Sequence, residues 1–196
     1  MKSEILHLLR HADGYVSGQQ LCETFGVSRT AVWKVINQLK EEGYVIDSVQ
    51  NKGYRITEYP DIITASEIES LLLDDSGNMQ GICRHIQYFD KTDSTNNQAK
   101  LAAEKNAPEG TLFVAECQTG GRGRRGKTWE SPAGSGIWMS LLLRPDISPE
   151  SASMLTLVLA VAMVDAINEE VQDAKCYVKW PNDIVLNNRK ISCLLY

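Results

Sequence analysis

The sequence lacks a paired cysteine framework. Its five cysteines are odd in number, scattered, and form no C-x-x-C pair. Disulfide-rich folds and structural zinc sites use closely spaced cysteine pairs, so this pattern favours reduced thiols in a cytoplasm. His7 and His11 are spaced to share one helix face, but no third ligand lies near them, and we predict no metal site.

A long apolar run and an excess of positive charge are also missing. The N-terminus, MKSEILHLLR, has no signal-peptide core, and the most apolar stretch, 154–167, is short and interrupted by Asp165. We therefore expect no membrane span. The net charge of −5 argues against a protein that coats nucleic acid, and 43% hydrophobic content over 196 residues fits one or two globular domains.

Residues 1–60 are predicted to form a small helical domain that ends in a β-hairpin. Apolar positions within 5–9 indicate a first helix, and Ser17 and Ser28 are N-cap candidates for two more helices. Asn51-Lys52-Gly53 then separates two strand-like segments. This order is typical of a winged helix-turn-helix domain, whose third helix fits the DNA major groove.

Two sets of polar side chains are candidates for DNA contact. They are Ser28, Arg29, Thr30 and Lys34 on the third helix, and Lys52 and Arg55 on the wing. The segment 1–58 carries seven cations and seven acids, so binding would need a local basic face and dimerisation. The alternative is a winged-helix interaction module that never touches DNA.

Residues 61–196 are predicted to be α+β. Thr64 and Glu67 form a capping box for a helix, and apolar segments at 82–89, 111–116 and 137–143 indicate strands. Helices are expected at 97–105 and 153–171, and short strands at 175–180 and 184–186. Strands and helices mix without βαβ regularity, which favours α+β over α/β.

A glycine–arginine loop lies between two predicted strands. Residues 122–127 carry four cations and no acid. Glycines allow a close backbone approach, exposed N–H groups can form an anion-binding nest, and guanidinium groups pair bidentately with phosphate. A solvated basic loop or an RNA-touching tract is the alternative. The setting between strands favours an ordered loop that binds a phosphate.

Four motifs occur in one order along the chain. They are Asp93-Ser94-Thr95-Asn96, the run from Gln118 through Gly121-Arg122-Gly123-Arg124-Arg125-Gly126 to Trp129, Lys179-Trp180-Pro181-Asn182-Asp183, and Arg189-Lys190-Ile191. Together they resemble the biotin protein ligases. With a winged helix in front, the chain is similar to the bifunctional biotin ligases and biotin operon repressors of bacteria.

The resemblance implies a class II synthetase-like catalytic domain at 61–196 and a two-step reaction. Biotin and ATP, with Mg²⁺, give biotinyl-5′-AMP, and biotin then passes to a lysine of a biotin carboxyl carrier protein. It also implies a cytoplasmic homodimer on operator DNA. The alternative is a ligand-sensing DNA-binding regulator without catalysis.

The resemblance also implies roles for individual residues. Biotin would be bound by Ser94, Thr95, Asn96 and Gln118, and its carboxylate or the α-phosphate by Lys190. Phosphate, carboxylate and adenylate would be held by the loop residues Gly121, Arg122, Gly123, Arg124, Arg125 and Gly126, with Trp129 packed under the loop. Adenine would be contacted by Asn182, and Lys179 and Asp183 would lie near phosphate and metal. Arg124, Lys179, Asp183 and Lys190 are the catalytic candidates. Trp180 and Pro181 are expected to be packing residues.

One departure from the family pattern concerns the end of the chain. Cys193 stands where the family has a glycine, and the sequence ends at Tyr196. We expect a truncated catalytic domain, without its later strands and a small β-barrel domain, and with weak or no ligase activity.

Overall fold

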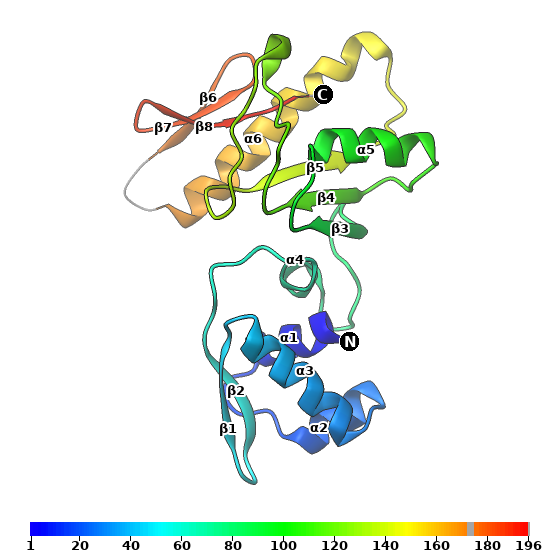
Figure 1. Cartoon of the computed structure of the whole chain (residues 1–196), viewed down its shortest axis with the longest axis vertical. Coiled ribbons are helices and arrows are strands. Elements are labelled where there is room, and N and C mark those ends of the chain that lie inside the picture. Colours follow the sequence, from blue (N-terminus) through cyan, green and yellow to red (C-terminus); the bar gives the residue numbers. More distant parts are fainter. Residues whose placement is uncertain (172–174, 196) are drawn as a thin grey trace. The chain divides into compact units, whose positions relative to one another are not determined.

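The computed structural model describes residues 1–171 and 175–195. The chain divides into two compact units, whose helices and strands are labelled in Figure 1. The first comprises Met1–Thr119 and Ser131–Leu143, and the second comprises Gly120–Glu130 and Arg144–Tyr196.

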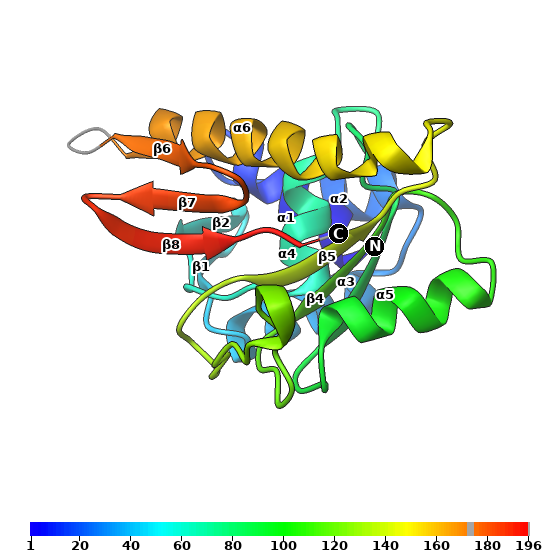
Figure 2. The ribbon, with the colours of Figure 1, turned by 90° about the horizontal axis from the view of Figure 1, so that it is seen from above.

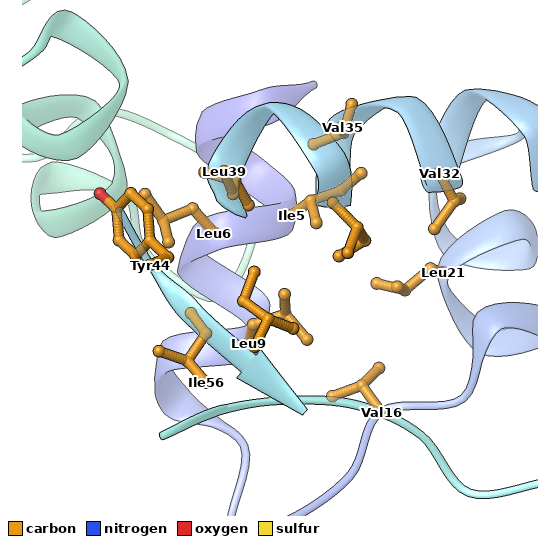
Figure 3. Close-up of a cluster of buried hydrophobic side chains, with 12 residues drawn as sticks. Ile5, Leu6, Leu9, Val16, Leu21, Val32, Val35, Leu39, Tyr44 and Ile56 are labelled. Atoms are coloured by element: carbon orange, nitrogen blue, oxygen red, sulfur yellow. The ribbon is translucent and has the colours of Figure 1, made fainter. Parts of the chain in front are cut away.

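The N-terminal part of the first unit is a winged helix. Its elements are α1 (Lys2–His11), α2 (Gly18–Phe25), α3 (Arg29–Glu41), β1 (Val45–Val49) and β2 (Gly53–Glu58). The Ser17 hydroxyl accepts from the Gln20 N–H at 3.0 Å and the Ser28 hydroxyl from the Ala31 N–H at 3.2 Å, which confirms both predicted N-caps. Twelve buried apolar side chains from all three helices and the wing form the core (Figure 3).

Backbone pairing holds the wing to the turn between α1 and α2. The Val16 and Tyr54 N–H groups each donate to the other residue's carbonyl at 2.9 Å. A Cβ on Gly53 would lie 2.0 Å from the Val16 carbonyl oxygen, and Gly53 has φ +112°. Any other residue at position 53 would therefore both clash and be strained.

Helix α4 (Ala65–Leu72) packs on α1 of the winged helix. Thr64 caps it as predicted, at 3.2 Å from the Glu67 N–H. The Glu67 carboxylate, however, turns to Arg10, at 2.5 Å, and to the Tyr44 hydroxyl. Burial and this hydrogen bond to Glu67 raise the pKa of Tyr44 above its ordinary value. Helix α4, which follows the predicted domain boundary at residue 60, thus packs on the winged helix.

A three-stranded mixed sheet completes the first unit. The strands β3 (His85–Phe89), β4 (Thr111–Ala115) and β5 (Trp138–Leu142) lie in the order β3-β4-β5. β3 and β4 are parallel, β4 and β5 antiparallel, and α5 (Thr95–Glu104) connects the parallel pair. This βαβ connection was not predicted, and β3 begins at His85 rather than Ile82. Every residue of central β4 is buried, as its uninterrupted apolar run requires.

The second unit is a helix packed on an antiparallel sheet. After the short 3₁₀ turns η1 (Arg124–Gly126) and η2 (Pro149–Ser151), α6 (Ala152–Glu170) runs along β6 (Cys176–Lys179), β7 (Asp183–Leu186) and β8 (Arg189–Cys193) (Figure 2). Ala160, Cys176, Ile184 and Leu194 form its buried core. Asn187 and Asn188 turn the chain between β7 and β8 with φ of 49° and 60°. The turn is thus completed before Lys190, which lies on β8 and not in the turn that its local sequence suggests.

Helix α6 carries an apolar surface beyond the side that faces its sheet. Met154, Val158 and Val161 are 57%, 64% and 52% exposed. By length and composition the segment Pro149–Glu170, with mean hydropathy 1.7, could cross a membrane. Core helices pass the same test, and Ala160, Met163, Val164 and Ile167 pack in the core of the second unit. Tyr196, where the predicted truncation falls, lies outside the described residues.

Candidate functional site

A partly buried network of neutral polar groups lies in the first unit, at the N-terminus of α5. The Gln118 side-chain oxygen accepts from the Thr95 N–H at 2.8 Å and from the Thr95 hydroxyl at 3.1 Å. The Gln118 amide nitrogen donates to the Ser131 hydroxyl at 3.0 Å. The hydroxyls of Thr95 and Ser140 lie 2.9 Å apart. Because both ends of the amide have partners, the orientation of Gln118 is fixed.

Ser94 does not serve as the helix cap that its position suggested. It is the N-cap residue of α5 and only 2% exposed, yet its side chain makes no cap hydrogen bond in the described part of the chain. Asp93 instead accepts from the side chains of Asn97 at 2.6 Å and Gln98 at 2.9 Å. These hydrogen bonds, with the Ser94 N–H, lower the pKa of Asp93 to about 2. Asp93 thus anchors the helix start, and the Ser94 hydroxyl is left out of the cap.

This arrangement suits a neutral, hydrogen-bonding ligand. Ser94, Thr95 and Ser131 are each no more than 3% exposed, and their functional groups are hydroxyls. Hydroxyls and amides can donate or accept, so fixed ones select the pattern of a polar ligand. Hydrogen bonds join Thr95 to Gln118, Ser94 precedes Thr95 in the chain, and Asn96 is half-buried one position further along α5. The predicted contacts of these four residues with biotin stay predictions.

Ser131 and Ser140 belong to this network but were missed in the sequence. Ser140 had a visible signal, because it is the one polar residue of the apolar segment 137–143. Ser131 had none, since only the bridge between Gln118 and Ser131 brings it near. Their placement therefore depends on strand pairing rather than on local sequence.

The glycine–arginine loop lies in the second unit and is a compact turn. Arg125 and Gly126 adopt left-handed conformations, with φ of 59° and 74°. The Gly123 N–H donates to the Lys127 carbonyl at 2.6 Å, and the Trp129 N–H donates to the Gly121 carbonyl at 2.9 Å. The Gly123 amide that a phosphate nest would need is thus used inside the loop. The three arginines of the loop are exposed, namely Arg122, Arg124 and Arg125. An anion would therefore meet their guanidinium groups rather than the backbone N–H groups.

Lys190 is held by an acid and an aromatic ring from the same unit. Its Nζ lies 2.7 Å from the Asp183 carboxylate and 5.0 Å from the centre of the Trp129 ring. Partial burial lowers the pKa of Lys190, but hydrogen bonds and charge from Asp183 and Cys193 outweigh it and hold the pKa above its usual value. The ammonium therefore stays charged at neutral pH. It lies over the face of the Trp129 ring, which attracts a cation, and Trp129 is the residue predicted to pack under the loop.

Asn182 is committed to contacts within the chain. It is 7% exposed, and its side-chain nitrogen donates to the Leu194 carbonyl at 2.9 Å and to the Cys193 sulfur at 3.3 Å. Its side-chain oxygen accepts from Arg124 at 3.5 Å. Asn182 thus links the loop to the end of β8, and its predicted contact with adenine stays a prediction.

In the second unit, five of the predicted site residues contact one another through side chains or neighbouring positions, and others do not. Arg124, Trp129, Asn182, Asp183 and Lys190 are joined by the contacts above. Lys179 is exposed at the end of β6, opposite Asp183 in the strand register. Trp180 is 77% exposed, so the prediction that it is a packing residue is wrong.

The DNA candidates in the winged helix have separate environments. Ser28 is the cap of α3, whereas Arg29, Thr30 and Lys34 are exposed on that helix. Trp33 is 57% exposed on α3, although the other large apolar residues of this helix are buried.

The comparisons with known proteins cover both parts of the chain. Residues 88–195 match the Biotin/lipoate A/B protein ligase family, and residues 2–55 match an HTH domain. The bifunctional ligase/repressor BirA of Bacillus subtilis is 42% identical over 97% of this chain and 57% of its own length. BirA of Escherichia coli is 34% identical over 98% of this chain and 56% of its own length.

A solved biotin protein ligase from Aquifex aeolicus, in complex with biotin and ATP, has 35% sequence identity and a TM-score of 0.49, over 57% of this chain and 45% of that one. The chain thus spans a little over half the length of the bifunctional relatives named above. The family match takes in the neutral network, the glycine–arginine loop and the Lys190 cluster, and the domain match takes in the three helices and most of the wing. The chain is therefore a member of the biotin/lipoate A/B protein ligase family with a helix-turn-helix domain at its N-terminus.

Proposed function

We propose that this chain has the activities of a biotin protein ligase and a biotin-dependent repressor. The observation that carries the proposal is the Lys190 cluster, in which a charged ammonium is held by Asp183 and Trp129 in the unit that also carries the arginine-rich loop. Fixed cations are what a reaction between two anions needs. The names of the bifunctional relatives support the same activities.

The first step joins biotin to the nucleotide. A carboxylate oxygen of biotin attacks the α-phosphorus of ATP, the bond from that phosphorus to the bridging oxygen breaks, and pyrophosphate leaves. Lys190 and the arginines of the loop would stabilise the negative charge that gathers on the α-phosphate oxygens. Mg²⁺ enters as part of the ATP complex, and Asp183 is the carboxylate that we place near it.

The second step transfers the acyl group. A neutral lysine amine of the carrier protein attacks the biotinyl carbonyl carbon, the bond to the AMP oxygen breaks, and AMP leaves. The amine loses its proton to solvent. Ser94, Thr95, Asn96 and Gln118 would hold the ring system of biotin during both steps, while Lys179 would lie near phosphate.

DNA binding by the winged helix is the second part of the proposal. Arg29, Thr30 and Lys34 would face the major groove, and Lys52 and Arg55 would reach the backbone. A homodimer on a palindromic operator would supply the affinity that an electrically balanced domain lacks. These roles fit a cytoplasmic protein without a membrane partner.

Three measurements on the purified chain test the proposal. Calorimetry with biotin and with ATP measures binding, pyrophosphate release measures the first step, and labelling of a carrier domain measures the second. Heat and pyrophosphate release together support a ligase. Binding that changes DNA affinity without pyrophosphate release would favour the alternative, a ligand-sensing regulator. Absence of heat with both ligands would overturn the proposal.

A further inference from the structure

One aromatic ring lies against both cations of the wing. Tyr15 is a half-buried residue in the turn between α1 and α2. The guanidinium carbon of Arg55 lies 5.0 Å from the centre of its ring, and the Nζ of Lys52 lies 5.9 Å from it. Both distances are within the reach of roughly 6 Å over which a cation is attracted to a ring face. Tyr15 therefore links two long, flexible side chains to the helical core.

The backbone fixes the ring and the cations relative to each other. Val16, next to Tyr15, pairs with Tyr54 through two hydrogen bonds of 2.9 Å. Tyr54 lies between the two cations in sequence, and Gly53 allows the close approach described above. The hairpin thus cannot move away from Tyr15 without breaking this pairing.

Asp47 is the counter-charge within the same cluster. Its carboxylate oxygen accepts from the Tyr15 hydroxyl at 3.3 Å and lies 3.7 Å from a terminal nitrogen of Arg55. Asp47 and Arg55 also face each other in the register of β1 and β2. Their side chains are 45% and 46% exposed, so solvent screens the pair and Arg55 can exchange Asp47 for another anion.

We propose that Tyr15 is a positioning residue for DNA-backbone binding by the wing. Its ring holds Lys52 and Arg55 in place before DNA arrives, while Asp47 offsets part of the charge of Arg55. Long cationic side chains lose rotamer freedom when they bind phosphate, and a side chain that is already ordered loses less. The inference rests on the proposed DNA binding of the winged helix and goes beyond it by naming what orders the wing.

The test uses the full chain and a mixed-sequence DNA duplex of about 30 base pairs, because contacts to phosphate do not depend on base sequence. Fluorescence anisotropy gives the affinity at several salt concentrations. Tyr15→Leu should weaken binding about two- to fivefold, because Lys52 and Arg55 would then be ordered only when they bind phosphate. The slope of log affinity against log salt should not change, since both cations still reach phosphate.

Control variants separate positioning from direct contact. Lys52→Gln and Arg55→Gln should each reduce the slope by about 0.9, because each removes one phosphate contact. Tyr15→Phe keeps the ring and should bind like the wild type, and Asp47→Asn should bind more tightly. In the K52Q/R55Q double variant, Tyr15→Leu should have no further effect.

A measurement on the unsubstituted protein guards against a variant that fails to fold. In the free wild-type chain, NMR signals of the Lys52 and Arg55 side-chain protons nearest the charged groups should be shifted by the Tyr15 ring current. Unshifted signals, or a Tyr15→Leu effect that persists in the K52Q/R55Q variant, would overturn the positioning role alone. A wild-type chain without salt-dependent DNA affinity would overturn DNA binding and this role together.

Discussion

The two polar clusters differ in charge and in burial. The cluster in the first unit consists of hydroxyls and one amide, and Ser94, Thr95 and Ser131 in it are almost completely buried. The cluster in the second unit contains Asp183 and Lys190, whose side chains are 25% and 37% exposed. Neutral hydrogen-bonding groups tolerate burial once they are paired, whereas charges lose much of their hydration energy.

This difference assigns separate tasks to the two clusters. A network in which Thr95, Gln118, Ser131 and Ser140 hold one another by hydrogen bonds is rigid, so it can discriminate between neutral ligands by shape and hydrogen bonding. A partly exposed ammonium is already charged in the free protein, and its attraction to an anionic ligand strengthens when that ligand replaces the water beside it. The first cluster would thus recognise the ring system of biotin, and the second would act on carboxylate and phosphate.

The strongest test of this division removes the charge of the second cluster. Lys190→Met should lower the rate of biotin-dependent pyrophosphate release about 100- to 1,000-fold, the usual loss when one group that stabilises developing charge is removed. Biotin affinity should change much less. Lys175→Met, an exposed lysine just before β6, is the matched control. Equal losses in both variants would contradict a specific role for Lys190.

Asn182→Ala should have the next largest effect, on stability. It removes the hydrogen bonds to the Leu194 carbonyl and to Arg124 and leaves a buried carbonyl unpaired, which costs about 1–3 kcal/mol. Urea unfolding of the ligand-free protein measures this loss. A variant with unchanged stability and reduced ATP affinity would instead support the predicted contact with adenine.

Thr95→Val tests the neutral cluster with little change in shape. The loss of hydroxyl bonds to Gln118 and Ser140 should lower biotin affinity about tenfold, or ~1.4 kcal/mol. Thr111→Val is a matched control, because Thr111 is also buried and its hydroxyl donates to the Pro108 carbonyl at 2.7 Å. The control should lose stability but keep its biotin affinity. An equal loss of biotin affinity in both variants would mean that general damage to packing, rather than the lost Thr95 hydroxyl, weakens binding.

The smallest predicted effect concerns pH. Hydrogen bonds from Asn97 and Gln98 hold the pKa of Asp93 at about 2, below its ordinary value of 3.8. A depressed acid pKa contributes stability above the unfolded pKa, and this contribution is lost as the pH falls from about 4 to about 2. Asp93→Asn should therefore flatten the acid side of the stability profile slightly.

Local patterns predicted most of the elements. The caps at Ser17, Ser28 and Thr64 and the apolar period of α3 depend on residues within one or two turns of helix, so sequence alone locates them. The same holds for the glycine–arginine loop, whose composition predicts a basic turn. Roles for Ser94, Thr95, Gln118 and Lys190 could be predicted only from family motifs, because a resemblance carries information about distant contacts that periodicity does not.

The sequence by itself determined which residues start helices, which strands are apolar and where the positive charge gathers. Only the tertiary structure decided that Glu67 turns to Arg10 and Tyr44, that Asp93 rather than Ser94 ties down the start of α5, and that Asp183 holds Lys190. Glu67 could have reached back to the start of its own helix, but the packing of α4 on α1 favoured the distant partners Arg10 and Tyr44. Competition of that kind is resolved by the folded geometry, because the distant partner enters the balance only once packing has brought it within hydrogen-bonding range.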